Sequence, residues 1–118
     1  MGKLGLMKMK NKNILIVYNT CGIKRDNSEW YIKCMQSILD QDFDRDNYKI
    51  LWSSCLNTPQ CVKQVYSHFK NNISYCFHSE PHTVNITFNK AVREMIQHFG
   101  QFDYYMYIDS GVTFENQK

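Results

Sequence analysis

The sequence predicts an α/β protein, a three-layer α/β/α Rossmann-like parallel sheet of about four strands with three helices. Short apolar runs alternate along the chain with segments whose apolar residues recur at helical spacing. Continuous apolar runs are typical of strands that are covered on both faces, and the longer period is typical of amphipathic helices. Strict alternation of the two favours a parallel sheet, because each crossover between parallel strands carries a helix.

Four runs are predicted to be strands, and polar turn residues follow each of them. β-branched and aromatic side chains favour strands, whereas Gly, Asn and Ser favour the turns that end them. The last run, Tyr104 to Ile108, is expected to be a buried strand with Asp109 at its carboxyl end. The four predicted strands are residues 14–18, 48–53, 73–77 and 104–108.

Three helices are predicted between these strands, over residues 29–40, 59–70 and 84–99. A polar residue suited to capping the first turn precedes each helix. The predicted caps are Asn27 or Ser28, then Thr58, then Thr83.

The third helix has the most regular pattern, and Gly100 is expected to end it. Its predicted buried row consists of Val84, Phe88, Ala91, Val92, Met95, Ile96 and Phe99.

The 118-residue chain has the length of one domain and a net charge of +3. Its first twelve residues contain four lysines and no acid, so residues 1–12 are predicted to be a flexible basic tail. Residues 13–118 are predicted to form a single domain. This remainder is close to neutral, and no nucleic-acid partner is expected.

Cysteine usage indicates a reducing compartment. The five cysteines include no CxxC pair, which argues against a disulfide framework and against a zinc site. Cys34 and Cys76 lie within apolar patterns and are expected to be buried. No apolar run approaches the ~18 residues of a membrane span, and no secretion signal is present. A cytoplasmic protein without a transmembrane segment is therefore expected.

The carboxyl ends of the predicted strands should meet at one edge of the sheet, because right-handed crossovers align them. We call this edge the rim, and it comprises residues 19–21, 53–55, 77–79 and 109–111. Ligands of open parallel sheets bind outside such ends. The rim contains one carboxylate, Asp109, and neither a GxGxxG nor a P-loop motif. Standard dinucleotide and P-loop sites are therefore excluded.

Four stretches of the chain resemble the N-terminal half of a GT-A glycosyltransferase of the family 2 type. They are residues 14–20, 34–43, 85–92 and 107–114. In the second, Ser37-Ile38-Leu39 followed by Gln41 and Phe43 is similar to the end of the family's first helix. The third is similar to the helix that leads toward the metal site, and the fourth looks like the DxD motif.

The resemblance implies a nucleotide-sugar donor site at the rim. Asn19 and Thr20 would lie against the nucleoside, and Asn89 would lie near the diphosphate or ribose. Asp109 would approach the ribose or a bridging Mn²⁺ or Mg²⁺. Such a cation neutralises charge that builds on a departing diphosphate.

The chain departs from the family pattern at two positions of the site. Gly111 stands where the DxD motif has its second acid, which weakens the expected metal site. The family usually has an acid after the second strand to bind the base, and here only Ser54 or Asn57 could substitute. The half that normally follows DxD brings the acceptor site and catalytic base, so the domain is expected to be truncated and incomplete for catalysis.

Two other functions are compatible with the same alternation of strands and helices. One is a flavodoxin-like or receiver-like interaction domain, although a receiver needs acids where Asn19 and Phe77 stand. The other is a homo-oligomer, because an open sheet can expose an apolar edge or face that pairs with another copy.

Overall fold

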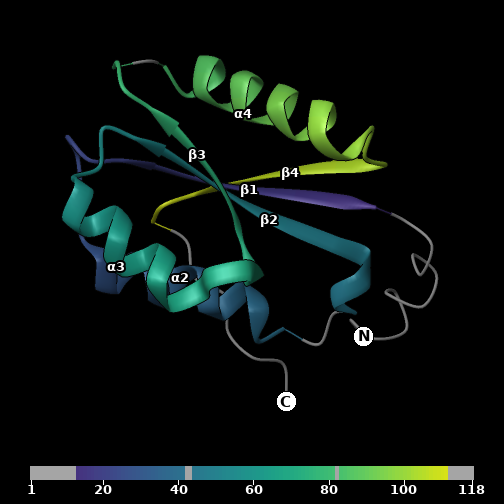
Figure 1. The fold of residues 1–118 in the computed structure, drawn as a ribbon, viewed down its shortest axis with the longest axis horizontal. Coiled ribbons are helices and arrows are strands. Elements are labelled where there is room, and N and C mark those ends of the chain that lie inside the picture. The colour runs from purple at the N-terminus through teal and green to yellow at the C-terminus, as the bar shows by residue number, and fades with distance from the viewer. Residues whose placement is uncertain (1–12, 42–43, 82, 112–118) are drawn as a thin grey trace.

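A computed structural model describes residues 13–41, 44–81 and 83–111 (Figure 1). Strands and helices alternate along the chain, and all four strands are parallel, which confirms the predicted fold class. The predicted basic tail lies outside the described residues, as do positions 42–43 and 112–114 of the resembling stretches. The elements, with η for a short 3₁₀ helix, are β1 (Ile14–Cys21), α2 (Ser28–Leu39), η1 (Arg45–Asn47), β2 (Tyr48–Cys55), α3 (Pro59–Phe69), η2 (Lys70–Asn72), β3 (Ser74–His78), α4 (Val84–Phe99) and β4 (Tyr104–Asp109).

The sheet has the order β3-β2-β1-β4, so β1 and β2 are central and β3 and β4 are the edges. Asn19 in β1 is in register with Ser53 of β2 and with Asp109 of β4. The register therefore brings the predicted rim together from strands that are far apart in the sequence.

Helices cover both faces of the sheet, with α2 and α3 on one face and α4 on the other (Figure 1). Trp52 is the centre of the larger core, where its ring lies 6.2 Å from Tyr31 and 5.1 Å from Tyr75. The smaller core, under α4, is mainly aliphatic and consists of Leu15, Val17, Leu51, Cys76, Ala91, Met95 and Phe102.

The helices begin at the predicted caps. Asn27, rather than Ser28, caps α2 by accepting a 3.1 Å bond from the main-chain N–H of Trp30. Thr58 and Thr83 cap α3 and α4 in the same way. Gly100 follows α4 with a φ of +85°, in the region that favours glycine.

The prediction of a buried last strand is wrong. Ile108 is buried, but Tyr104 is 50% exposed, Tyr105 37%, Met106 47% and Tyr107 38%. Among the described strands, β4 pairs only with β1, while the contacts of α4 with the sheet are mainly with β1 and β2. An apolar run identifies a strand, but only the strand order decides whether helices cover it.

The predicted buried row of α4 is only partly correct. Ala91 and Met95 are buried and Phe88, Val92 and Ile96 pack against the smaller core, but Val84 and Phe99 are exposed. These two residues lie at the first and last positions of the helix, beyond the sheet surface that α4 covers. Thr87 is buried instead.

Candidate functional site

The rim carries one amide and one carboxylate on neighbouring strands. Asn19 is nearly buried, and its side-chain oxygen accepts a 3.2 Å bond from the hydroxyl of Thr87 on α4. Asp109 is exposed, and its Oδ1 accepts a 2.8 Å bond from the N–H of Ser110. Among the described residues, no other group donates to this carboxylate. Asp109 is therefore available to a ligand, whereas Asn19 is held against α4.

Three predicted site residues, two in the rim and one just after it, are buried and joined by hydrogen bonds. The hydroxyls of Thr20 and Ser54 each donate a 2.7 Å bond to Oδ1 of Asn57. Trp52 donates from Nε1 to the Thr20 hydroxyl at 2.9 Å. Thr20, Ser54 and Asn57 are buried, and their hydrogen bonds hold the loop between β2 and α3 against β1 and β2.

A carboxylate reaches the start of α3 from another loop. Asp26, between β1 and α2, accepts bonds of 3.0 Å from the Asn57 amide and 3.1 Å from the Thr58 N–H. Its Oδ2 accepts a 2.6 Å bond from the Thr58 hydroxyl. Burial alone would raise the pKa of Asp26, but the bonds from Thr58 and Asn57 outweigh it and lower the pKa. An acid was sought in the sequence only directly after the second strand. Asp26 was missed because this residue lies 31 positions before Asn57 in the sequence.

The turn after β4 is attached to the opposite face of the sheet from α4. The carbonyl oxygen of Ser110 accepts bonds from Nε1 of Trp30 at 2.6 Å, the hydroxyl of Tyr18 at 3.1 Å and the thiol of Cys34 at 3.6 Å. Burial raises the pKa of both Tyr18 and Cys34, so both remain protonated donors at neutral pH. Trp30 and Cys34 are four positions apart, as expected for one side of a helix, and nothing in the sequence indicates that they share the Ser110 carbonyl as an acceptor.

The loops after β1 and β2 are interlocked at Gly22. Its N–H donates a 2.8 Å bond to the carbonyl of Cys55. A Cβ at this position would lie 2.2 Å from the carbonyl oxygen of Leu56, closer than atoms can approach. Leu56 itself has a φ of +59°. Only glycine therefore fits here, and the shape of the rim depends on it.

The remaining predicted site residues are exposed. Asn89 lies on α4 two positions after Thr87. Gly111 follows the Ser110 turn, and a Cβ added there would meet no atom within 4 Å. Glycine is therefore not required for space at position 111.

The described residues do not by themselves fit a divalent cation. They include no group of three or more His, Cys, Asp or Glu side chains able to hold a metal ion. Asp109 is the only acid at the strand ends, and Gly111 offers no side-chain ligand. Mg²⁺ requires near-octahedral oxygen coordination, so most ligands would come from elsewhere.

A buried polar cluster lies under the rim between β2, β3 and α4. The third strand was predicted over residues 73–77, but His78 also belongs to β3, and its Nε2 lies 2.8 Å from the hydroxyl of Ser53. The thiol of Cys76 donates a 3.3 Å bond to Glu94. Burial and the neighbouring Glu94 raise the pKa of Cys76 to about 12. The thiol is therefore not a nucleophile at neutral pH.

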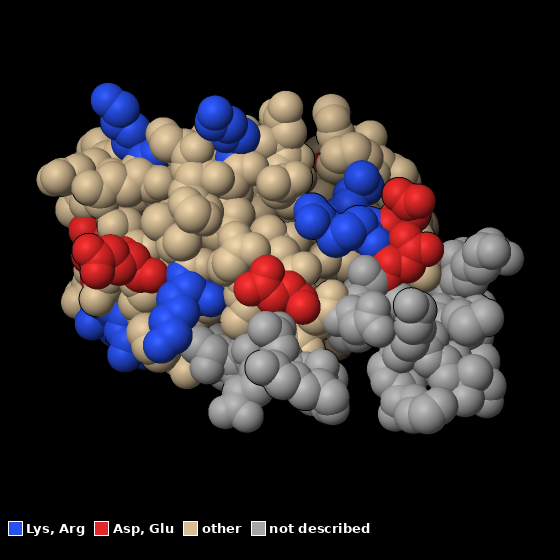
Figure 2. All heavy atoms as spheres, turned by 90° about the horizontal axis from the view of Figure 1, so that it is seen from below, with Lys and Arg blue, Asp and Glu red and all other residues tan. Residues whose placement is uncertain are grey.

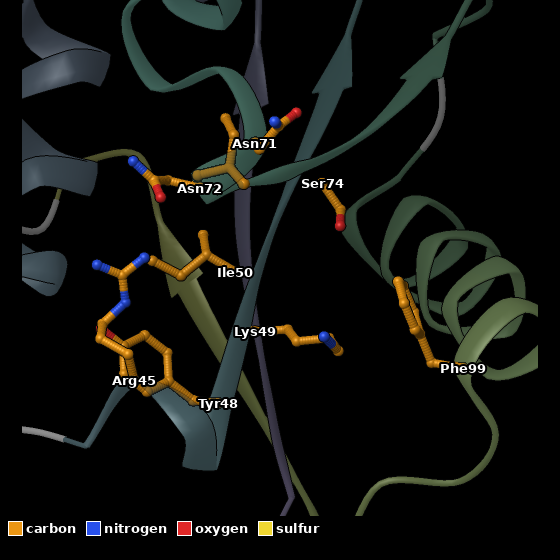
Figure 3. Close-up of a pocket in the computed structure, with 9 residues that line it drawn as sticks. Arg45, Tyr48, Lys49, Ile50, Asn71, Asn72, Ser74 and Phe99 are labelled. Carbon is orange, nitrogen blue, oxygen red and sulfur yellow. The ribbon is translucent and has the colours of Figure 1, made fainter.

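A pocket of about 230 Å³ lies at the opposite end of the strands from the rim. Lys49 points toward Phe99, and Arg45 lies beside Tyr48 on the other side of β2 (Figure 3). The cationic atoms lie 4.5 Å and 5.8 Å from the centres of these rings. Because the two cations are directed apart, they do not converge on one ligand.

The face formed by α2 and α3 has mixed charge. Basic and acidic side chains are both present on it, in small separate groups (Figure 2). A continuous basic surface, which nucleic-acid binding requires, is not seen on this face. Within the described ranges, no helix is both long and apolar enough to span a membrane.

Comparison with known proteins identifies the fold. The chain matches TarS residues 1–349 of S. aureus with a TM-score of 0.58 and 17% identity, over 83% of this chain and 27% of that one. It matches the mannosyltransferase PcManGT of Pyrobaculum calidifontis, solved with GDP-Man and Mn²⁺, with a TM-score of 0.60 and 11% identity, over 94% and 35%. TarS has also been solved with UDP and with UDP-GlcNAc.

These matches show that the chain has the fold of GT-A glycosyltransferases over the aligned region. It spans about a quarter to a third of the length of those structures. No protein-family model and no curated protein matches the sequence.

Proposed function

We propose that the chain is the donor-binding domain of a GT-A, family 2-like glycosyltransferase and binds a nucleotide-diphospho-sugar at the rim. The observation that carries the proposal is the register of Asn19 with Asp109, within a fold shared with structures solved with UDP-GlcNAc and GDP-Man. Ligands of such sheets bind outside the carboxyl ends of the strands.

The site residues have two different roles in this proposal. Asp109, Asn89 and the main chain at Gly111 are exposed and would contact the donor. Thr20, Ser54 and Asn57 are buried, so they would act by holding the loops that shape the nucleoside site. Asn19 is only 6% exposed, so it would contact the ligand through that small surface while it remains bonded to Thr87.

A divalent cation would have Asp109 as its single side-chain ligand from the rim. We therefore expect Mn²⁺ or Mg²⁺ to bind weakly and only together with the donor. The domain is proposed to bind the donor, and no acceptor, linkage or transfer step is assigned to it. A cytoplasmic location fits the five free cysteines.

Titration of the folded protein with UDP-, GDP- and CMP-sugars, with and without Mn²⁺, tests the proposal. We expect saturable binding of one nucleotide class, weakened by Asp109→Ala. Absence of binding by a protein with a cooperative unfolding transition would contradict it.

A second candidate function is self-association through β4. Four large apolar side chains are exposed on this edge strand, and unpaired edges are templates for another strand. A second copy could pair with β4 and extend the sheet. Sedimentation over a wide concentration range decides: a monomer throughout removes this function.

A further inference from the structure

Two cations lie against the indole that holds the Ser110 turn. The guanidinium carbon of Arg25 lies 5.0 Å from the centre of the Trp30 ring, and the ammonium of Lys33 lies 5.6 Å from it. The same indole donates its N–H to the carbonyl of Ser110. One ring therefore connects a guanidinium to the turn formed by residues 109–111.

The backbone of Arg25 is fixed while its side chain is exposed. Its N–H donates a 3.0 Å bond to the carbonyl of Cys21, and its carbonyl accepts a bond from the Tyr31 hydroxyl. The adjacent carboxylate of Asp26 is turned away, toward Asn57 and Thr58. Among the residues that the structure describes, no acid forms an ion pair with Arg25.

The positive charge of Arg25 acts on the groups that bond to Ser110. Burial raises the pKa of Tyr18 and of Cys34, and the charge of Arg25 lowers both. The guanidinium is therefore close enough for its field to reach these two donors and the turn that they hold.

A guanidinium is suited to a diphosphate, because its planar fork donates two parallel hydrogen bonds to phosphate oxygens and it stays charged at any physiological pH. The turn beside it lacks the second acid with which a DxD motif holds a cation. The guanidinium that lies against Trp30 can therefore supply, as an amino-acid side chain, positive charge that a bound cation would otherwise supply at this turn.

We propose that Arg25, held by Trp30, binds the diphosphate of the donor and supplies positive charge that the weakened cation site does not. This inference rests on the proposed donor-binding function and assigns the group that recognises the diphosphate. Trp30 is the positioning residue, because it contacts both Arg25 and Ser110.

Calorimetric titration of the full chain with UDP, GDP and the matching nucleosides, in Mn²⁺ and in EDTA, tests the assignment. We expect Arg25→Ala to weaken nucleoside diphosphate binding by about 10- to 100-fold, the effect of losing hydrogen bonds to a charged group. Nucleoside binding should be unchanged, and Arg25→Lys should restore part of the affinity. EDTA should change the affinity of the wild type by less than about threefold, a small free-energy difference.

Lys24→Ala is the matched control, since Lys24 is an exposed cation on the same loop and also donates its N–H to Cys21. The affinity of Lys24→Ala for UDP or GDP should stay near that of the wild type. The role of Arg25 would be overturned if Arg25→Ala bound as tightly as the wild type, or if the wild type lost its binding in EDTA. Neither outcome would contradict the donor-binding function. Absence of nucleotide binding by the wild type would overturn the donor-binding function as well.

Discussion

The indole N–H of Trp30 donates a 2.6 Å hydrogen bond to the carbonyl oxygen of Ser110, 80 positions further along the chain. This bond ties α2 to the turn after β4, where the exposed carboxylate of Asp109 and the open position of Gly111 lie. The geometry of the rim beside β4 therefore depends on α2, a helix that is distant in the sequence but adjacent in space.

Replacing Trp30 by Phe removes this donor but keeps an aromatic ring. We expect the free energy of unfolding to fall by about 1–2 kcal/mol, because a partly buried bond is lost while Tyr18 and Cys34 still donate to Ser110. Urea unfolding measures this change. Tyr66→Phe, on the exposed side of α3, is the control and should be near neutral. Equal losses in the two variants would contradict a specific role for the indole N–H.

Replacing Gly111 by Asp restores the second acid of a DxD motif. No atom lies within 4 Å of the added Cβ, so we expect little change in stability. A second carboxylate should make nucleotide affinity depend more strongly on Mn²⁺, and titrations with and without the cation measure this. Gly111→Asn has similar size without the charge. If both variants respond to Mn²⁺ alike, the turn is not a cation site.

Replacing Gly22 by Ala should be strongly destabilising. The new Cβ would lie 2.2 Å from the Leu56 carbonyl oxygen and 2.7 Å from the Cα of Asn57, both main-chain atoms that cannot easily move. We expect a loss of about 2 kcal/mol or more, the range for severe overpacking. Thermal unfolding measures it, with Gly111→Ala as the near-neutral control. A Gly22→Ala protein as stable as the wild type would contradict the interlocked loops.

Replacing Asp26 by Asn should make stability less dependent on pH. The pKa of Asp26 is lower in the folded state, so its carboxylate stabilises the fold above its unfolded pKa of about 3.9. This contribution is lost as the pH falls through the lower, folded pKa. At pH 7 we expect Asp26→Asn to lose about 0.5–1 kcal/mol, the net contribution of an exposed side-chain hydrogen bond.

Unfolding curves between pH 7 and pH 3 test this sign. The difference between wild type and Asp26→Asn should be full at neutral pH and shrink below about pH 4, near the unfolded pKa. A difference that grew as the pH fell would contradict a stabilising role for the Asp26 carboxylate at Thr58.

Replacing Met106 by Lys tests the exposed edge. Met106 is 47% exposed in an edge strand, so a lysine can extend into solvent and stability should change by less than about 1 kcal/mol. If the protein self-associates through β4, the charge should raise its dissociation constant at least about tenfold, because charged edges oppose strand pairing. Sedimentation equilibrium measures this. Unchanged association would place the interface elsewhere.

Much of the fold could be predicted because it is encoded locally. The runs at residues 14–18 and 48–53 identified the central strands, and Asn27, Thr58 and Thr83 marked the helix starts. Each signal is read within a few residues, since caps and periodicity act over one or two helical turns.

The site was less accessible to sequence reasoning. The position of Asp109 at a strand end was predicted correctly, and its role remains a prediction. Thr20, Ser54 and Asn57 were chosen as contacts for a ligand, but the structure buries them in bonds to one another. A polar residue at a strand end looks the same in the sequence whether it faces solvent or a neighbouring loop.

The sequence by itself determined the order and type of the elements and which polar residues stand at the strand ends, because these follow from local propensity and periodicity. Only the tertiary structure decided that Asp26 bonds to Thr58, the cap of α3, that Trp30 bonds to Ser110 and that β4 is an exposed edge. These outcomes depend on which elements become neighbours in space. That choice is made by the packing of the whole sheet, which no short stretch of sequence specifies.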